Sequence, residues 1–295
     1  MASLRDIRKR IKSVKNSQKI TKAMKMVSAA KLRRAEQRVK AARPYADKLG
    51  RTCAGLAKRA ELMGEAPHPL LTSRPEATKG GTIEILSVTS DRGLCGAFNS
   101  NVVRRALRQR FDLKDSAKEI RVSTIGRKAT EGMKREKIAI RKHYEKIVDS
   151  PSYEKTRAIA LELTDAYQKG EIDALYLVYN EFVNATTQRV VVDQVLPIKP
   201  AEVAAGEVLS DHEYEPNRDE LLSTLLPRQL ATRIYRAVIE SVAAEHGARM
   251  SAMDNASKNA KEMVDALSLY ANRVRQAAIT KELMEIIGGA EALKG

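Results

Sequence analysis

The chain has 295 residues, of which 43% are hydrophobic and 31% charged, a balance that allows a buried core and argues against wholesale disorder. Aromatic residues make up only 4% and tryptophan is absent, which disfavours stacking surfaces for single-stranded nucleic acid. Two cysteines without paired spacing disfavour a disulfide scaffold or zinc site, and no apolar run approaches the roughly 20 residues that span a bilayer.

The net charge of +16 is concentrated near the N-terminus. Residues 1–43 contain fifteen Lys and Arg residues and two acidic residues, so they carry +13 of that charge. The first ten residues are too polar for a secretory signal peptide. A basic rod of this kind predicts an anionic partner, which can be nucleic acid, an acidic membrane surface or an acidic protein sleeve.

Residues 1–60 are predicted to form a long N-terminal coiled-coil helix, in which Pro44 produces a kink without ending the helix. Apolar residues step by three and four at its start, which predicts a heptad seam, and others keep one side of the helix mostly apolar farther along. These positions are Leu4, Ile7, Ile11 and Val14, followed by Ile20, Met24, Val27 and Leu32. Residues 61–81, rich in Pro and Gly, are predicted to be a linker.

Residues 82–200 alternate between strand and helix patterns. Runs rich in β-branched residues occur at Thr82–Thr89, Glu119–Ile125, Ala174–Tyr179 and Gln188–Val195. Helical patterns occupy about 97–111, 126–136 and 152–169. The alternation predicts a small α/β domain with a largely parallel sheet. A polar connector is expected at 201–218.

Residues 219–287 are predicted to form a second long helix, ended by Gly288–Gly289 and followed by a tail at 288–295. Residues 228–287 alone span roughly 90 Å as a helix. The helix is therefore expected to project beyond the α/β domain and to pair antiparallel with the first helix. Small residues recur every four positions and favour close packing, although alanine is also simply the best helix former: Ala244, Ala248, Ala252, Ala256 and Ala260. The last turns carry apolar residues that another protein is expected to enclose.

No motif for catalysis or ligand binding is strong. A GxxxxGK[ST] phosphate loop is absent, which disfavours nucleotide hydrolysis. The turn at 90–96 (SDRGLCG) follows a strand and opens a helix, a place where α/β folds bind phosphate, but a structural turn fits it better. Cys95 has no histidine near it in sequence, so a buried thiol is expected. Glu282 and Glu285 share a helix face, where a solvated or partner-facing edge is favoured over a metal site. No catalytic, cofactor or metal site is predicted.

Four blocks of sequence resemble the gamma subunits of bacterial F-type ATP synthases, in the family's order. They are residues 7–35 (IRKRIKSVKNSQKITKAMKMVSAAKLRRA), 90–99 (SDRGLCGAFN), 247–260 (GARMSAMDNASKNA) and 275–292 (RQAAITKELMEIIGGAEA). The last block matches the family signature through Ile279, Thr280, Glu282, Glu285, Gly289 and Ala290. The resemblance therefore extends over the whole chain.

The resemblance implies an antiparallel coiled coil of the terminal helices that carries a Rossmann-like α/β domain. It also implies a central rotor shaft inside a ring of three alpha and three beta subunits, resting on the c ring beside epsilon, at the cytoplasmic face of the bacterial inner membrane. Catalysis would reside in the beta subunits, with no cofactor or small-molecule substrate on this chain. The main alternative is a basic coiled-coil protein that binds nucleic acid.

The same resemblance suggests three groups of contact residues. Arg8, Lys22, Met24 and Lys25 resemble the part of the first helix that faces an acidic lever of the beta subunit. Arg275, Gln276, Thr280, Glu282 and Glu285 resemble upper-shaft residues that meet loops of the catalytic ring. Tyr214 and Glu215 resemble a motif near the foot, where epsilon and the c ring dock.

Overall fold

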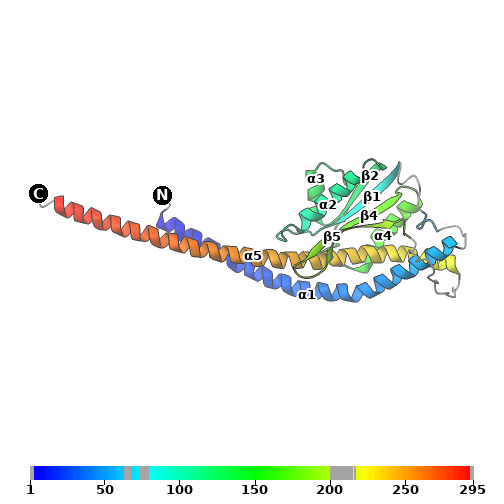
Figure 1. Ribbon diagram of the computed structural model, residues 1–295, viewed down its shortest axis with the longest axis horizontal. Coiled ribbons are helices and arrows are strands. Elements are labelled where there is room, and N and C mark those ends of the chain that lie inside the picture. The colour runs from blue at the N-terminus through cyan, green and yellow to red at the C-terminus, as the bar shows by residue number, and fades with distance from the viewer. Residues whose placement is uncertain (1–2, 63–67, 73–79, 200–214, 216, 293–295) are drawn as a thin grey trace. The chain divides into compact units, whose positions relative to one another are not determined.

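The structure is a computed structural model that describes residues 3–62, 68–72, 80–199, 215 and 217–292. Two long helices, α1 (Leu4–Leu62) and α5 (Arg218–Ala292), flank an α/β region in the chain (Figure 1). The chain divides into two compact units, one made of residues 1–28 and 250–295, the other of residues 29–249. The predicted linker at 61–81 and connector at 201–218 fall largely outside the described residues.

The larger unit contains a five-stranded sheet in the order β3-β2-β1-β4-β5. Its strands are β1 (Gly81–Val88), β2 (Ala117–Ile125), β3 (Lys142–Tyr144), β4 (Ala174–Phe182) and β5 (Gln188–Leu196). The strands β1 to β4 run parallel to one another, and β5 pairs antiparallel with β4. The prediction of a largely parallel sheet is confirmed. The prediction did not include β3, because this three-residue strand carries no alternation of apolar and polar residues.

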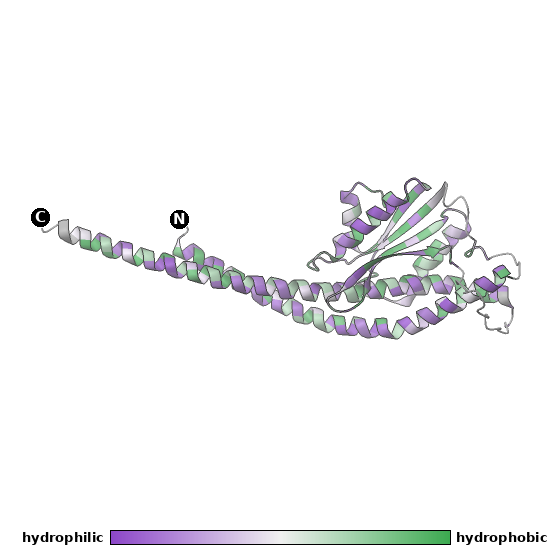
Figure 2. Cartoon of the chain, viewed as in Figure 1, coloured by the Kyte–Doolittle hydropathy of each residue, from purple (hydrophilic) through white to green (hydrophobic). Residues whose placement is uncertain are grey.

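The sheet is covered on both faces, as its strand pattern requires. Ile83 and Ile85 of β1 join a cluster with α2 (Phe98–Asp112) and α3 (Arg127–Arg135). Leu86 and Val88 join the larger cluster with α4 (Tyr153–Gln168), α1 and α5. Alternate residues of a strand point to opposite faces, so one strand supplies both cores. Figure 2 shows the apolar residues of the central strands and the mostly polar surface of α2.

In the same unit α1 and α5 run antiparallel, since Arg43 pairs with Glu240 and Asp47 with Arg236. Buried residues on α1 recur at spacings of three or four in two runs that are ten positions apart: Leu32, Ala35 and Val39, then Leu49, Cys53, Leu56 and Ala60. The helix continues through Pro44, which is exposed, so that water can satisfy the backbone carbonyl that the missing N–H leaves unpaired.

The smaller unit is an antiparallel pair formed by the start of α1 and the end of α5. Gln18 donates to the carbonyl oxygen of Ser257 at 3.4 Å, and Lys25 Nζ lies 2.6 Å from Asp254 Oδ1. Apolar residues buried in this pair are Ile7, Met253, Val264 and Ala271. Together with the Rossmann-like sheet, the antiparallel helices confirm the predicted fold class.

One part of the predicted seam is wrong. Ile20 and Val27 are 61% and 56% exposed, although we expected them on the buried side. The steps of three and four that begin at Ile7 lead to polar positions instead, among them the buried Ser28. Apolar residues that are out of this register remain on the outside of the helix.

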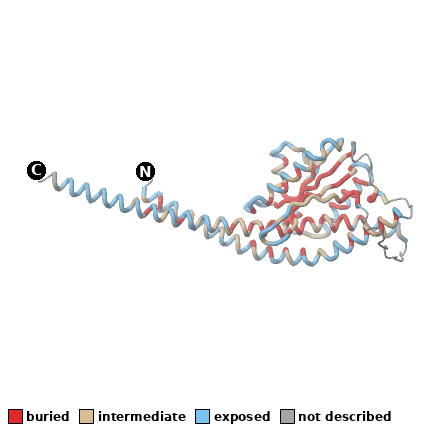
Figure 3. The backbone as a smooth tube through the Cα atoms, viewed as in Figure 1, coloured by how far each residue is buried: buried red, intermediate tan, exposed pale blue. Residues whose placement is uncertain are grey.

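The end of α5 also differs from expectation. The helix continues through Gly288 and Gly289 to Ala292. Glycine weakens a helix by about 1 kcal/mol relative to alanine but does not forbid it, and neither glycine has the positive φ of a terminating cap. Residues 275–289 are all exposed (Figure 3), including apolar residues at Ile279, Leu283, Met284, Ile286 and Ile287. The exposure of these apolar residues is confirmed, and their enclosure by another protein stays a prediction.

Candidate functional site

The turn that follows β1 lies at the carboxyl ends of the parallel strands, beside the point where the strand order reverses. α/β folds bind phosphate groups at this position. Here the first backbone N–H groups of α3 already have acceptors from the chain itself. The N–H of Arg127 donates to Asp91 Oδ1 at 2.8 Å, and the N–H of Ala129 donates to Thr89 Oγ1 at 2.7 Å. Asp91 therefore stands where an anionic ligand of α3 would bind.

The same turn is held in shape by its own side chains. Asn99 Oδ1 accepts hydrogen bonds from the N–H of Ser90 at 3.0 Å and from its hydroxyl at 2.9 Å. A Cβ at Gly126, where φ is 91°, would lie 2.1 Å from the carbonyl oxygen of Thr89, so only glycine fits. These contacts support a structural turn and not a phosphate loop.

Cys95 is buried in this turn. Its sulfur accepts a hydrogen bond from Asn99 Nδ2 at 3.2 Å, and burial raises the pKa of the thiol. A raised pKa keeps the group protonated and weakly nucleophilic. The expectation of a buried thiol is confirmed.

A buried ion pair on α5 docks onto this turn. Arg249 Nη2 donates to the carbonyl oxygen of Gly93 at 3.0 Å, and Arg249 Nη1 lies 2.6 Å from Glu245 Oε1. Both side chains are about nine-tenths buried. Desolvation raises the pKa of Glu245, an effect that the nearby Arg249 opposes. We call this contact the turn joint.

A second buried contact, which we call the strand joint, links α1, α5 and the end of β4. Glu240 on α5 is fully buried and accepts from Arg43 Nε at 2.8 Å and from the N–H of Phe182 at 2.9 Å. Arg43 Nη2 also donates to the carbonyl oxygen of Phe182 at 2.7 Å. The hydrogen bond to Glu240 raises the pKa of Arg43. Three elements distant in sequence therefore share one hydrogen-bonded charge pair.

Sequence reasoning missed both joints. Arg43 is one of fifteen basic residues in 1–43, and no motif marks Glu240, Glu245 or Arg249. The one available signal was the presence of charged residues within the alanine-rich, core-facing part of α5, where an unpaired charge is strongly disfavoured.

The predicted contact residues on α1 lie in the smaller unit. Arg8 and Lys22 are exposed, whereas Met24 and Lys25 are half-buried. Lys25 pairs with Asp254, and this pairing lowers the pKa of the Asp254 carboxyl group. Twelve of the fifteen basic residues in 1–43 have no described carboxylate within salt-bridge distance, the exceptions being Lys25, Lys40 and Arg43. Most of this charge therefore remains available to a partner.

The predicted contact residues on α5 form a separate group near its end. Arg275, Gln276, Thr280, Glu282 and Glu285 are all exposed. Thr280 donates to the carbonyl oxygen of Gln276, and Glu285 lies 3.5 Å from Lys281 one turn away. Among the described residues, no hydrogen bond or ion pair joins this group to the one on α1.

At the predicted foot, Tyr214 lies outside the described residues, and Glu215 is exposed. Within the described ranges, no cluster of three His, Cys, Asp or Glu side chains is arranged to hold a metal ion. No described helix combines the length and apolar character needed to cross a membrane.

The chain is similar to known proteins over nearly its whole length. The family model for ATP synthase matches residues 3–293. The ATP synthase gamma chain of Anaeromyxobacter sp. strain K is 51% identical over 294 residues, which cover 100% of both chains. The gamma chain of Geobacter metallireducens is 48% identical over 295 residues, again with complete coverage of both.

Solved structures agree on the fold. A chain of the central stalk and c ring of Tetrahymena thermophila mitochondrial ATP synthase has a TM-score of 0.61 at 25% identity, over 81% of this chain and 99% of that one. A chain of the Euglena gracilis enzyme has a TM-score of 0.68 at 19% identity, over 98% and 94%. The chain has long antiparallel helices, and its own side chains occupy the α/β crevice after β1. Together with the similarity over its whole length, these features show that the chain belongs to the ATP synthase family, as one of its gamma chains.

Proposed function

We propose that this chain is the central rotor shaft that transmits rotation between a proton-driven c ring and the ring of three alpha and three beta subunits. Rotation in one direction drives ATP synthesis, and ATP hydrolysis drives the reverse. The chain is non-catalytic, and catalysis takes place in the beta subunits. It acts at the cytoplasmic face of the bacterial inner membrane as a peripheral subunit, and epsilon binds beside it near the c ring.

The observation that carries this proposal is the construction of α5. The helix runs without interruption for 75 residues, or about 110 Å. Its middle is fixed to the α/β region by the buried turn joint and strand joint, and its last fifteen described side chains are exposed and largely unpartnered. A helix that is fixed to the α/β region in its middle and exposed at its end suits the transfer of torque from the c ring to the surrounding alpha and beta subunits.

The two joints suit this role because they resist shear. In the strand joint, the buried carboxylate of Glu240 is paired with Arg43 of α1, so displacing α5 would leave a buried charge unpaired. In the turn joint, Glu245 and Arg249 both belong to α5, and displacement would instead break the charge-assisted hydrogen bonds from Arg249 to the carbonyl oxygen of Gly93. Apolar contacts alone are non-directional and resist sliding less strongly. Torque applied to the α/β domain would therefore reach α5 through Arg43–Glu240 and Gly93–Arg249.

The exposed groups are assigned to partners in the same proposal. Arg8, Lys22, Met24 and Lys25 face an acidic segment of the beta subunit. Residues on the end of α5 meet loops of the catalytic ring: Arg275, Gln276, Thr280, Glu282 and Glu285. Tyr214 and Glu215 contact epsilon and the c ring. Because the chain matches the ATP synthase family over its whole length, we favour a protein partner over nucleic acid for the basic helix.

The direct test is co-expression with the alpha and beta subunits of the same host, followed by a single-molecule rotation assay. We expect a complex with three alpha, three beta and one copy of this chain, in which a tag on the α/β domain turns in three equal steps when ATP is added. The proposal would be overturned if the chain did not bind the alpha and beta subunits and instead copurified with nucleic acid in a salt-sensitive manner.

A further inference from the structure

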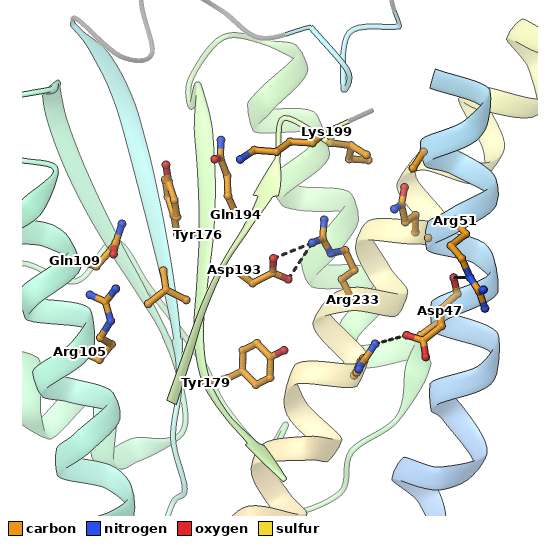
Figure 4. A pocket seen from close by; sticks show the side chains of 17 residues that line it. Asp47, Arg51, Arg105, Gln109, Tyr176, Tyr179, Asp193, Gln194, Lys199 and Arg233 are labelled. Carbon is orange, nitrogen blue, oxygen red and sulfur yellow. Dashed lines mark hydrogen bonds and ion pairs between the residues drawn. The ribbon is translucent and has the colours of Figure 1, made fainter. Parts of the chain in front are cut away.

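A cleft of about 1000 Å³ lies within the larger unit, around the free edge of β5 (Figure 4). Among the residues that the structure describes, β5 is the last strand of the sheet and pairs only with β4, so its other edge has no described strand partner. An unpaired edge presents a row of backbone donors and acceptors that can accept another strand. Residues from α1, α2, α5 and the β4–β5 pair line the cleft.

The cleft has two walls, one on each side of β5. Arg105 and Gln109 of α2 stand on one side with Tyr176, and Arg51 and Arg233 stand on the other, on α1 and α5 (Figure 4). A chain laid along β5 can contact both walls, because alternate side chains of a strand point to opposite faces.

The charges that line the cleft are unbalanced. Its two carboxylates are already paired within the chain, Asp193 with Arg233 at 2.8 Å and Asp47 with Arg236 at 2.6 Å. The three other cations, Arg51, Arg105 and Lys199, have no lining carboxylate of their own. Arg105 is 3.8 Å from Asp112, which Arg108 approaches more closely at 3.1 Å. The lining therefore carries a net charge of +3, which favours an acidic ligand.

A buried acceptor in the lining also lacks a partner. Gln229 on α5 is 5% exposed, and its Oε1 atom accepts no hydrogen bond among the described residues. Buried amide oxygens are nearly always paired, and this atom is itself buried, so a ligand would reach it only after the Gln229 side chain turned toward the cleft. A peptide N–H or a side-chain donor could then pair with it, whereas a bare phosphate dianion could not.

We propose that this cleft binds an extended, carboxylate-bearing segment of a partner protein, which adds as a strand to the free edge of β5. Its alternate side chains meet Arg105 on one wall and Arg51 on the other, Lys199 contributes its charge beside Gln194 (Figure 4), and the main chain pairs with β5. The inference rests on the proposed function only in that it takes the partner from the same ATP synthase complex.

The test uses the assembled complex, with a benzophenone amino acid placed at Gln109 in one preparation and at Ala54 in another. We expect both positions, on opposite walls, to crosslink to one acidic segment of a single partner subunit. The charge-reversed double variant Arg105→Glu/Lys199→Glu should lower the crosslink yield at least tenfold. The control is the single variant Arg108→Glu, which makes the same substitution as Arg105→Glu but on the outer face of α2, and it should leave the yield unchanged.

Hydrogen exchange separates strand addition from simple charge attraction. In the complex, the outward N–H groups of β5 should exchange at least tenfold faster in the charge-reversed variant than in the Arg108→Glu control. Crosslinks to a helical or uncharged segment, unchanged exchange in β5, or loss of crosslinks on adding inorganic phosphate alone would each overturn the proposal. If the complex assembles and rotates but the crosslinks are absent, only the cleft proposal fails; if it does not assemble, the proposed function fails.

Discussion

Arg249 of α5 donates two hydrogen bonds to the carbonyl oxygen of Gly93, at 3.0 and 3.4 Å, in the turn that follows β1. In many α/β proteins the corresponding crevice holds a phosphate-bearing ligand. Here the guanidinium group of a long helix occupies the approach to the turn, and Asp91 caps α3. The crevice thus serves to attach a helix, which is consistent with a chain that transmits rotation.

Breaking the turn joint should destabilise the chain strongly. Arg249→Leu removes the guanidinium group and leaves the carboxylate of Glu245 buried without its partner, which typically costs about 3–5 kcal/mol. Urea denaturation of the purified chain should show this loss, and Glu245→Gln in the same chain should restore part of it. The control Arg273→Leu alters an exposed arginine on the same helix and should change the unfolding free energy by less than about 0.5 kcal/mol. Equal midpoints for Arg249→Leu and Arg273→Leu would contradict the role of the joint.

The stability of the larger unit should fall as the pH is lowered from about 6.5 to about 4. Burial and the nearby charges of Arg249 and Lys31 lower the pKa of His246 to about 4. Below pH 6.5 the unfolded chain therefore binds a proton that the folded chain does not bind, and the unfolded state gains stability. Replacing the ring by His246→Gln should make the denaturation midpoint less dependent on pH between 7 and 5. An identical pH dependence in both proteins would show that His246 does not titrate as described.

A lysine at position 24 should impair coupling. Met24 is half-buried between the basic residues Lys22 and Lys25, and Met24→Lys adds a cation on the side proposed to face an acidic segment of the beta subunit. An added attraction of up to about 1 kcal/mol corresponds to roughly fivefold slower release of that contact. The measurement is ATP-driven proton pumping per ATP hydrolysed in membrane vesicles.

The control for this variant is Met26→Lys, which adds the same charge two residues away at a position that is 61% exposed. Successive residues are about 100° apart around a helix, so the two lysines point in very different directions. We expect Met26→Lys to pump normally. Equal pumping per ATP in Met24→Lys and the unaltered protein would refute the proposed contact.

The apolar end of α5 should matter for assembly and not for the stability of the chain. Ile286→Ser alters an exposed residue and should change the unfolding free energy by less than about 0.5 kcal/mol, yet reduce the fraction of chain that copurifies with alpha and beta. Met253→Ala, at a buried position of the same helix, should instead cost about 2–5 kcal/mol. Normal assembly of Ile286→Ser would indicate that no partner encloses this end.

Local pattern in the sequence determined which segments became helix and strand. The β-branched runs around β1, β2, β4 and β5 predicted strands, and long stretches poor in proline and glycine predicted α1 and α5. These elements follow from short-range backbone and side-chain preferences, which can be recognised within a short stretch of sequence. A three-residue strand such as β3 is too short to carry such a pattern and forms because β2 offers it an edge.

Tertiary structure decided the rest, because it depends on residues that are far apart in the chain. The register that buries Ser28 and exposes Val27 is fixed by the partner helix. The strand joint connects Arg43 to Glu240 across 197 positions, and the turn joint connects Gly93 to Arg249 across 156. The charge of each residue is visible in the sequence. Its partner, its burial and its orientation exist only when the sheet has brought α1, α5 and the turn after β1 together.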